Sequence, residues 1–298
     1  MAAVPARGLR PRRPRALIAW CAAVAAAVAM AAGVLSADAH RVVSIIPATT
    51  EMLFAMGAGD RVVGVGSYDQ FPPEVGRLPR VGALLDPDVE RIISLRPDLV
   101  ILYGTQADLR EQLERAHIPF YPYEHRGLAD IPQTIRRIGA RVGVDDRADA
   151  LAARVENDIE NIRQRVDGLP RPRTLLVFGR QRHALTDIEA SGGQGFLHDM
   201  LEAAGGTDVL ADIHRQSVTM STEMVLARAP EVIIELSYAR GDPMTEADLA
   251  DWNQLASVPA VRRHRVFLLS GNQFVVPGPR VAAATEAIAR TLHPEAFK

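Results

Sequence analysis

The chain has 298 residues, and 34 Lys and Arg oppose 36 Asp and Glu, which gives a formal net charge of −2 at pH 7. Nucleic-acid binding normally needs a basic surface, so this balance excludes nucleic acid as an expected partner. Cys21 is the only cysteine and lies near the N-terminus. If that region is removed, disulfides, thiolate zinc sites and cysteine catalysis are excluded for the rest of the chain.

The first 39 residues differ from everything that follows. Five arginines precede an apolar stretch from Ala16 to Leu35, which is followed by Ala37-Asp38-Ala39. This order predicts a secretory signal peptide, residues 1–39, and a mature protein in the periplasm or on the extracytoplasmic face. After cleavage, 29 basic side chains would oppose 35 acidic ones. The alternative is a retained anchor, because about 20 apolar residues can span a bilayer. The protein would then be a membrane-tethered receptor or signalling module.

A long helix divides the remaining chain. From Arg147 to Val166, apolar residues recur at spacings of three and four, which predicts an amphipathic helix. At about 1.5 Å per residue this helix is roughly 30 Å long, the width of a small domain. We therefore predict an N-terminal lobe at residues 40–145, a bridging helix at 146–168 and a C-terminal lobe at 169–298.

Both halves alternate short apolar runs with helical patterns. Such alternation indicates mostly parallel sheets flanked by helices, so the predicted fold class is α/β with two lobes. The predicted strands are Val42–Ile46, Val62–Val65, Leu99–Leu102 and Phe120–Tyr123 in the first half, and Thr174–Phe178, Val232–Leu236 and Val266–Leu269 in the second.

The two halves also share a motif. In each, a glutamate, six residues, a proline and an acid precede an aliphatic strand, at Glu90–Ile101 and at Glu223–Ile234. A helix ends before each proline, because proline disfavours helical geometry in the residue before it. Two lobes of common design are therefore expected. Asp86 and Ser221 are the candidate caps of these helices.

These residues resemble a known family, the cobalamin and iron-siderophore class of periplasmic substrate-binding proteins. The similarity runs from about Arg41 to the C-terminus and rests on Ser44–Glu51, Leu53–Asp60, Phe71–Glu74 and the Glu90 and Glu223 motifs. The resemblance implies two Rossmann-like lobes joined by one long helix, with a metal-chelate ligand, a corrinoid or a ferric siderophore, captured between them. It also implies a monomer that docks on the permease dimer of an ABC importer, with Glu90 and Glu223 inserted into arginine pockets of the two permease subunits.

Ligand contacts are expected where the strands end, because the crevice of an open α/β sheet lies outside the carboxyl ends of its strands. Tyr123, Glu124, His125, Arg126, Arg182 and Arg240 belong to this wider group. The residues predicted to bind the ligand are Tyr68, Asp69, Tyr103, Arg180, His183, Tyr238, Asn272, Gln273 and Phe274. Such a mixture of rings and polar groups suits a large ligand with an apolar body and polar edges.

Three positions bear on the choice of ligand. The resemblance would place a tryptophan near Leu84 and another near Ser217 against a corrin ring, and a haem-ligating tyrosine near Phe71; this chain has none of them.

Arg280 opens the last helix, where the helix dipole disfavours a cation, so it needs either a carboxylate partner or an anionic ligand.

Metal-ion binding and catalysis are the other classes to weigh. The histidines are scattered without ligand spacing, so we expect no bare metal site and no resident cofactor. Hydrolase, zinc-protease and Walker motifs are absent from the sequence, so we expect no enzyme, although an enzyme on this scaffold is the alternative. The glycine-rich run Ser191–Gly195 is interpreted as a turn that does not directly follow a strand.

Overall fold

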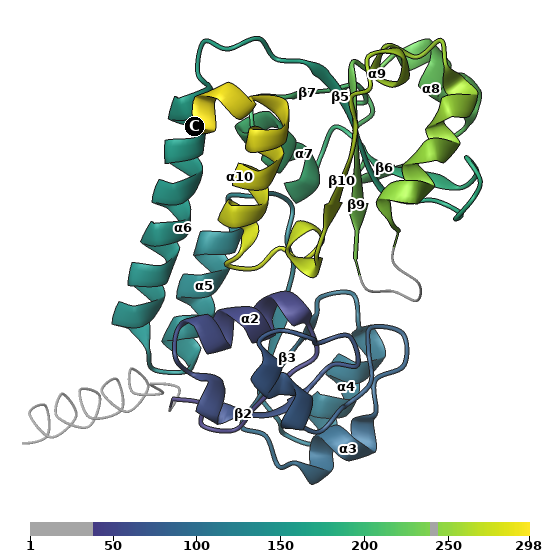
Figure 1. Ribbon diagram of the computed structural model, residues 1–298. Helices are drawn as coiled ribbons and strands as arrows, with labels where there is room; N and C mark the ends of the chain where they lie inside the picture. The colour runs from purple at the N-terminus through teal and green to yellow at the C-terminus, as the bar shows by residue number, and fades with distance from the viewer. Residues whose placement is uncertain (1–37, 239–243) are drawn as a thin grey trace, which may run out of the picture. The chain divides into compact units, whose positions relative to one another are not determined.

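The structure is a computed structural model that describes residues 38–238 and 244–298 (Figure 1). The predicted signal peptide falls outside the described residues, apart from Asp38 and Ala39. Ala39 is buried, and its N–H donates to the carbonyl of Arg141 at 2.9 Å. Within the described residues, no helix is both long and apolar enough to cross a membrane.

The N-terminal lobe is a four-stranded parallel sheet in the order β2-β1-β3-β4. Alternate residues of its strands face two apolar clusters, one containing Val42 and Ile101 and the other Val43 and Leu102. Both faces are therefore buried, as a parallel sheet requires. Its strands are β1 (Val42–Ser44), β2 (Val62–Val65), β3 (Leu99–Tyr103) and β4 (Phe120–Tyr123), and its helices are α2 (Pro47–Ala55), α3 (Val89–Ser94), α4 (Ala107–Arg115) and α5 (Asp130–Arg141), with short 3₁₀ turns at Gly59–Arg61 and Pro73–Arg77.

The C-terminal lobe contains a six-stranded sheet in the order β10-β9-β5-β6-β8, with β7 also paired to β5. Its strands are β5 (Arg173–Gly179), β6 (Ile188–Ser191), β7 (Thr207–Asp208), β8 (Ser217–Met220), β9 (Val232–Ser237) and β10 (Val266–Ser270). Its helices are α7 (Phe196–Ala203), α8 (Thr222–Arg228), α9 (Pro259–Arg262) and α10 (Val281–Leu292), with 3₁₀ segments η3 (Glu246–Leu255), η4 (Asn272–Phe274) and η5 (Pro294–Phe297).

This second sheet is mixed but mostly parallel, in agreement with the predicted fold class; the antiparallel part was not expected. β10, β9, β5 and β7 pair in parallel, whereas β6 pairs antiparallel with both β5 and β8. Ser217 and Thr219 of β8 are exposed, so this edge has no continuous apolar run to reveal it in the sequence. β6 ends at Ser191, so the glycine-rich run does follow a strand directly, contrary to our interpretation.

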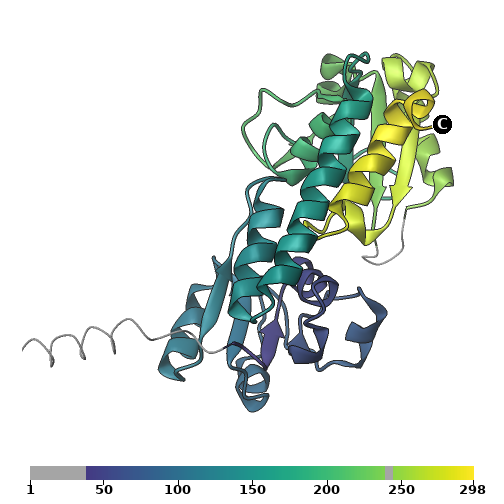
Figure 2. The same cartoon turned by 90° about the vertical axis from the view of Figure 1, so that its left-hand side faces the viewer.

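The bridging helix α6 (Asp145–Val166) is confirmed and packs against α5 of the N-terminal lobe and α10 of the C-terminal lobe (Figure 2). Its buried residues are the apolar positions of the predicted stripe, Ala148, Leu151, Ala152, Val155, Ile159, Ile162 and Val166. They join one core cluster that contains residues from both lobes, such as Ile101 and Ile234. Both lobes therefore pack against this one apolar face of α6, which we call the seam.

An ion pair links the two lobes beside this seam. Arg280, the residue before α10, donates from Nε and Nη2 to the two carboxylate oxygens of Glu51 on α2, at 2.9 and 2.6 Å. Glu51 is 4% exposed, and burial raises the pKa of its carboxyl although Arg280 opposes the rise. The guanidinium also lies 4.0 Å from the centroid of the Phe71 ring. Of the two partners expected for Arg280, the carboxylate is confirmed.

Candidate ligand-binding cleft

A cavity of about 400 Å³ lies between the lobes, at the carboxyl ends of the strands. Tyr103 and Tyr123 are the last residues of β3 and β4 in the N-terminal lobe. Phe178 of β5, Tyr238 after β9 and Asn272 after β10 come from the C-terminal lobe. Strand ends of both sheets therefore contribute to one site, as the rule for open α/β sheets predicts.

Aromatic side chains dominate this cavity. Four of the five tyrosines of the chain line it, and Phe178 and Phe196 add two further rings; the tyrosines are Tyr68, Tyr103, Tyr123 and Tyr238. The chain as a whole is only 5% aromatic, so the rings are concentrated here. Aromatic faces bind flat apolar bodies, and the tyrosine hydroxyl adds a polar group to each ring.

Several of the rings contact one another across the lobes. The Tyr103 and Tyr123 centroids lie 6.4 Å apart, His125 stacks on Tyr123 at 5.6 Å, and Phe196 at the start of α7 meets His125 edge-on at 5.6 Å. Burial lowers the pKa of His125, against a smaller opposing effect of Asp130, so this imidazole is neutral at pH 7. The four rings form a continuous wall from one lobe to the other.

The described lining of the cleft carries no formal charge. Besides the neutral His125, its polar side chains are Gln70, Asn272 and the tyrosines. Arg240 and Asp242, which follow Tyr238 in the sequence, lie outside the described residues. The described wall therefore offers hydrogen bonds and π faces, with no counter-charge for an ionic ligand.

One buried group in this wall lacks a partner. The Tyr123 hydroxyl has no hydrogen-bond partner among the described residues, and the side chain is 2% exposed. Burial raises the pKa of this phenol, so it keeps its proton and remains a donor. A buried donor without an acceptor costs free energy, which a ligand oxygen would recover.

Four of the nine residues predicted to bind the ligand line the cleft: Tyr68, Tyr103, Tyr238 and Asn272. Asn272 also donates to Gln70 of the N-terminal lobe at 2.5 Å, so these two residues join the lobes at the cleft. Phe274 is 4% exposed within the core, and Gln273 contacts Arg280 at 3.4 Å. Neither of them lines the cavity, although both directly follow the lining residue Asn272 in the sequence.

Arg180 and His183 lie elsewhere. Arg180 donates from Nε to Glu235 at 2.5 Å and from Nη1 to Asp251 at 2.7 Å, and its side chain is 1% exposed. The Trp252 indole donates to the same Glu235 oxygen at 2.7 Å, so the guanidinium is committed to a buried network under η3. The side chain of His183 is 73% exposed, 3.5 Å from Asp248.

Asp69 lies between the cleft residues Tyr68 and Gln70 but is buried. It is 1% exposed, and its carboxylate oxygens have no hydrogen-bond partner among the described residues. Burial raises the pKa of this carboxyl to about 7, and the nearby Glu51 carboxylate acts in the same direction. Arg80 donates to the carbonyl of Asp69 at 2.8 Å, which fixes the loop between Tyr68 and Gln70.

Several residues of the cleft are not among the nine predicted to bind the ligand. Tyr123 and His125 belong to the wider strand-end group, whereas Phe178 and Phe196 lie outside it. Phe178 lies one residue before the end of β5, and Phe196 opens a helix after Gly195. Positions just beyond each strand therefore do not include a ring one residue before the strand end or a ring on the following helix.

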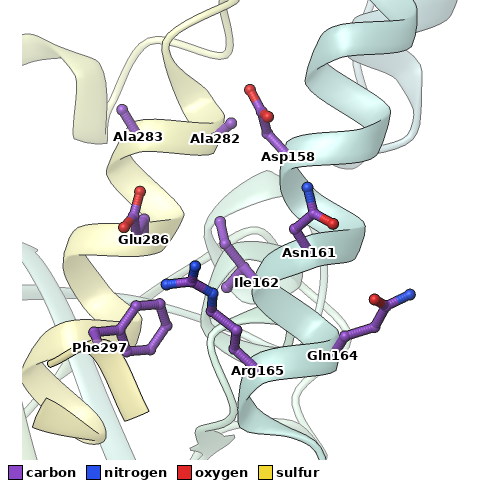
Figure 3. A pocket seen from close by; sticks show the side chains of 9 residues that line it. All are labelled: Asp158, Asn161, Ile162, Gln164, Arg165, Ala282, Ala283, Glu286 and Phe297. Carbon is purple, nitrogen blue, oxygen red and sulfur yellow. The ribbon is translucent and has the colours of Figure 1, made fainter. Parts of the chain in front are cut away.

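A second cavity in the described residues lies away from the strand ends. It measures about 660 Å³ and is a groove between α6 and α10 (Figure 3). Its lining is mostly polar, with Asp158 and Arg165 on α6 and Glu286 on α10, and Arg165 lies over the Phe297 ring at 5.5 Å. This groove has neither the ring cluster nor the convergence of strand ends that marks the smaller cleft.

Comparison with known proteins decides the family. The model of the periplasmic binding protein family matches residues 42–272. The chain belongs to this family. A substrate-binding role in an importer follows from that membership.

Individual relatives of this periplasmic binding protein cover most of its length. An uncharacterized ABC transporter substrate-binding lipoprotein of Bacillus subtilis is 27% identical over 88% of this chain and 82% of its own. The vitamin B12-binding protein of Salmonella typhimurium is 29% identical over 85% of this chain and 90% of its own. The periplasmic heme-binding protein of Roseiflexus sp. RS-1 superposes with a TM-score of 0.72 at 27% identity, over 86% of this chain and 99% of its own.

The Asp69 carboxyl predicts a pH dependence of stability. In the unfolded chain this group loses its proton near pH 4, whereas in the folded protein it does so near pH 7. Between these values the folded state holds the extra proton, so the free energy of unfolding should fall as pH rises from about 4 to 7, by up to about 4 kcal/mol. Denaturant unfolding across this range measures the slope.

Asp69→Asn removes the titration while keeping the shape, so its unfolding free energy should vary less with pH than that of the wild type. Asp158→Asn, on the exposed face of α6, is the matched control and should keep the wild-type slope. A wild-type slope in Asp69→Asn would contradict the assignment.

Proposed function

We propose that this periplasmic binding protein captures an uncharged metal chelate, a corrinoid or a ferric siderophore of neutral type, and delivers it to an ABC importer. The observation that carries the proposal is the interlobe cleft, where four of the five tyrosines surround a cavity whose described lining has no formal charge. The vitamin B12-binding and heme-binding relatives support the chelate class, because both named ligands are large rings around a metal.

The chelate class suits the chemistry of the cleft. A chelate brings its own metal ligands, so the protein needs flat apolar contacts and a few hydrogen bonds, which the rings, Gln70 and Asn272 offer. Within the described residues, no group of three or more His, Cys, Asp or Glu could hold a bare metal ion. In this proposal the metal arrives as part of the ligand.

The lack of charge in the described lining narrows the class of ligand further. An anionic chelate in this cleft would lose its hydration without a described cation to replace it, which is costly. The half-buried Arg280 and the buried Arg180 are already paired with carboxylates. Leu84 lines the cleft where a corrin-stacking tryptophan would stand in the resemblance, so any corrinoid would stack on the tyrosines instead.

The remaining parts of the proposal concern location and partners. The protein acts outside the cytoplasm after export through its N-terminal segment, as a monomer without catalytic activity. It docks on the permease dimer through Glu90 on α3 and Glu223 on α8, one in each lobe. Both side chains are exposed in the first turn of their helices, and hydrogen bonding to Ser221 lowers the pKa of Glu223, so this carboxylate stays ionised.

The caps of these docking helices differ in one detail from expectation. Ser221 accepts a hydrogen bond from the N–H of Met224 at 3.3 Å, as predicted. In α3 the cap is Asp88, which accepts from the N–H of Arg91 at 2.8 Å, and not Asp86. In both helices the cap thus lies two residues before the glutamate, which gives the two carboxylates the same position in the first turn.

A series of chelates tests the ligand class. Cyanocobalamin, dicyanocobinamide and ferrichrome are chelates without carboxylates, whereas haem and a ferric tricatecholate are anionic. We expect at least one of the first group to bind, and the anionic chelates to bind about tenfold more weakly or worse, because their charge is unpaired in the cleft. Quenching of intrinsic fluorescence measures the dissociation constants. Tightest binding by an anionic chelate would refute the charge argument, and no binding by any chelate would refute the class.

Tyr123→Phe tests the unpartnered hydroxyl. Removing a buried donor that has no acceptor should leave the free energy of unfolding unchanged or raise it by about 1 kcal/mol. Affinity for whichever chelate binds should fall by about 0.5 to 1.5 kcal/mol, or roughly 2- to 13-fold, if the hydroxyl donates to the ligand. Tyr121→Phe is the control, because Tyr121 is the one tyrosine that does not line the cleft. Equal affinities in the two variants would argue against a ligand contact at Tyr123.

The double variant Glu90→Ala, Glu223→Ala tests docking. Ligand binding in solution should be unchanged, since neither residue lines the cleft. Uptake through the reconstituted importer should fall steeply, because each lost carboxylate leaves a permease arginine unpaired at a cost of about 2 to 5 kcal/mol. Normal uptake by a correctly folded double variant would end the docking proposal.

A further inference from the structure

Six large hydrophobic side chains are strongly exposed in the described residues, and two of them lie on the docking helices. Ile93 on α3 is 41% exposed, and Leu226 on α8 is 42% exposed. The other four, Tyr68, Phe71, Leu84 and Leu85, belong to loops of the N-terminal lobe near the cleft. The exposed aliphatic residues on α3 and α8 therefore need an explanation other than ligand binding.

Ile93 and Leu226 occupy equivalent places in the two lobes. Each follows its glutamate by three residues, and in each helix the residue just before it, Ile92 or Val225, is fully buried. The strands that follow are also equivalent, since β3 pairs in parallel with β1, the first strand of its lobe, and β9 pairs in parallel with β5. Two unrelated surface residues would not be expected to share register, exposure and neighbours.

The spacing places each acid and each aliphatic residue together. Side chains three residues apart in a helix are neighbours on one face. Glu90 and Ile93 therefore form one patch and Glu223 and Leu226 the other, and Figure 1 shows α3 and α8 at the outer ends of their lobes. The same two-residue chemistry, a carboxylate beside an aliphatic side chain, is presented twice by one chain.

We propose that Ile93 and Leu226 are the apolar half of each docking patch, and that the partner is a twofold-symmetric permease whose two subunits each offer a cation beside an apolar contact. This inference rests on the docking role proposed above. A pseudo-symmetric pair of patches on one chain matches a partner in which one surface occurs twice, because each patch then meets the same surface. Because each patch combines a carboxylate with an aliphatic side chain, the surface that it meets should combine a cation with an apolar contact.

The two halves of a patch have different physical effects. Exposed carboxylates steer association and fix register, but salt screens them over about 8 Å at physiological ionic strength. Burial of an aliphatic side chain is not screened by salt, and it lengthens the lifetime of a complex by excluding water from the ion pair. The complex should therefore retain a salt-resistant component of affinity that belongs to Ile93 and Leu226.

The test compares Ile93→Ser, Leu226→Ser with Glu90→Gln, Glu223→Gln on the importer reconstituted in proteoliposomes. For the serine pair we expect binding to the permease to weaken about tenfold or more at low salt and by a similar factor at 0.5 M salt, because salt does not screen the lost apolar contact. Ligand affinity measured without the permease should stay within about twofold of the wild type, because neither residue lines the cleft. Ile93→Ala, Leu226→Ala repeats the test with better helix formers should the serine pair fold poorly.

Leu85→Ser is the matched control, because Leu85 is 92% exposed in the same lobe as Ile93, lies on neither helix and does not line the cleft. It should bind the permease as the wild type does. If the glutamine pair loses binding while the serine and alanine pairs keep it at both salt concentrations, the apolar half is wrong and carboxylate docking stands. If none of the pairs loses binding, both the inference and the docking proposal are wrong, while the ligand class remains to be judged by the chelate series.

Discussion

The buried seam of α6 is the interaction on which the rest of the structure depends. Seven apolar residues of one helix pack against α5 of the N-terminal lobe and α10 of the C-terminal lobe. Because both sheets are positioned by the same helix, the carboxyl ends of their strands face a common space. The cleft, the ring wall and the Glu51–Arg280 ion pair all follow from that arrangement.

The described lining of the cleft is uncharged, and two nearby elements carry arginines that are paired with carboxylates. Two arginines at the ends of elements form ion pairs with buried carboxylates: Arg280 pairs with Glu51, and Arg180 pairs with Glu235. Neither arginine lines the cleft, and an ion pair of this kind that lost one partner would be costly. The cleft is thus left to tyrosines and amides although the chain is 23% charged. Selection of an uncharged ligand would result from where the charges are paired rather than from their scarcity.

Much of this fold was accessible from the sequence, because continuous apolar runs and helical spacing report burial directly. All seven predicted strands exist, and α6 buries the predicted stripe. β6 and β8 were missed because both are four-residue strands in which polar residues alternate with apolar ones, so neither has a continuous apolar run. Among the binding candidates, Arg180 illustrates the limit: its partner Glu235 lies 55 residues away, and its inward direction becomes evident only once β5 and β9 are side by side. An acid inside the apolar run Val232–Leu236 was the available signal, since a buried carboxylate needs a cation.

The core cluster that runs through α6 also bears on how this molecule folds. Residues as distant as Val42 and Phe297 belong to one continuous apolar cluster, and α6 contributes to it along its whole length. Removing either lobe would expose the apolar face of α6 that the lobe covers. The two lobes are therefore not independent folding units, despite their similar design. Their unfolding should be a single cooperative event in which the helix and both sheets lose structure together.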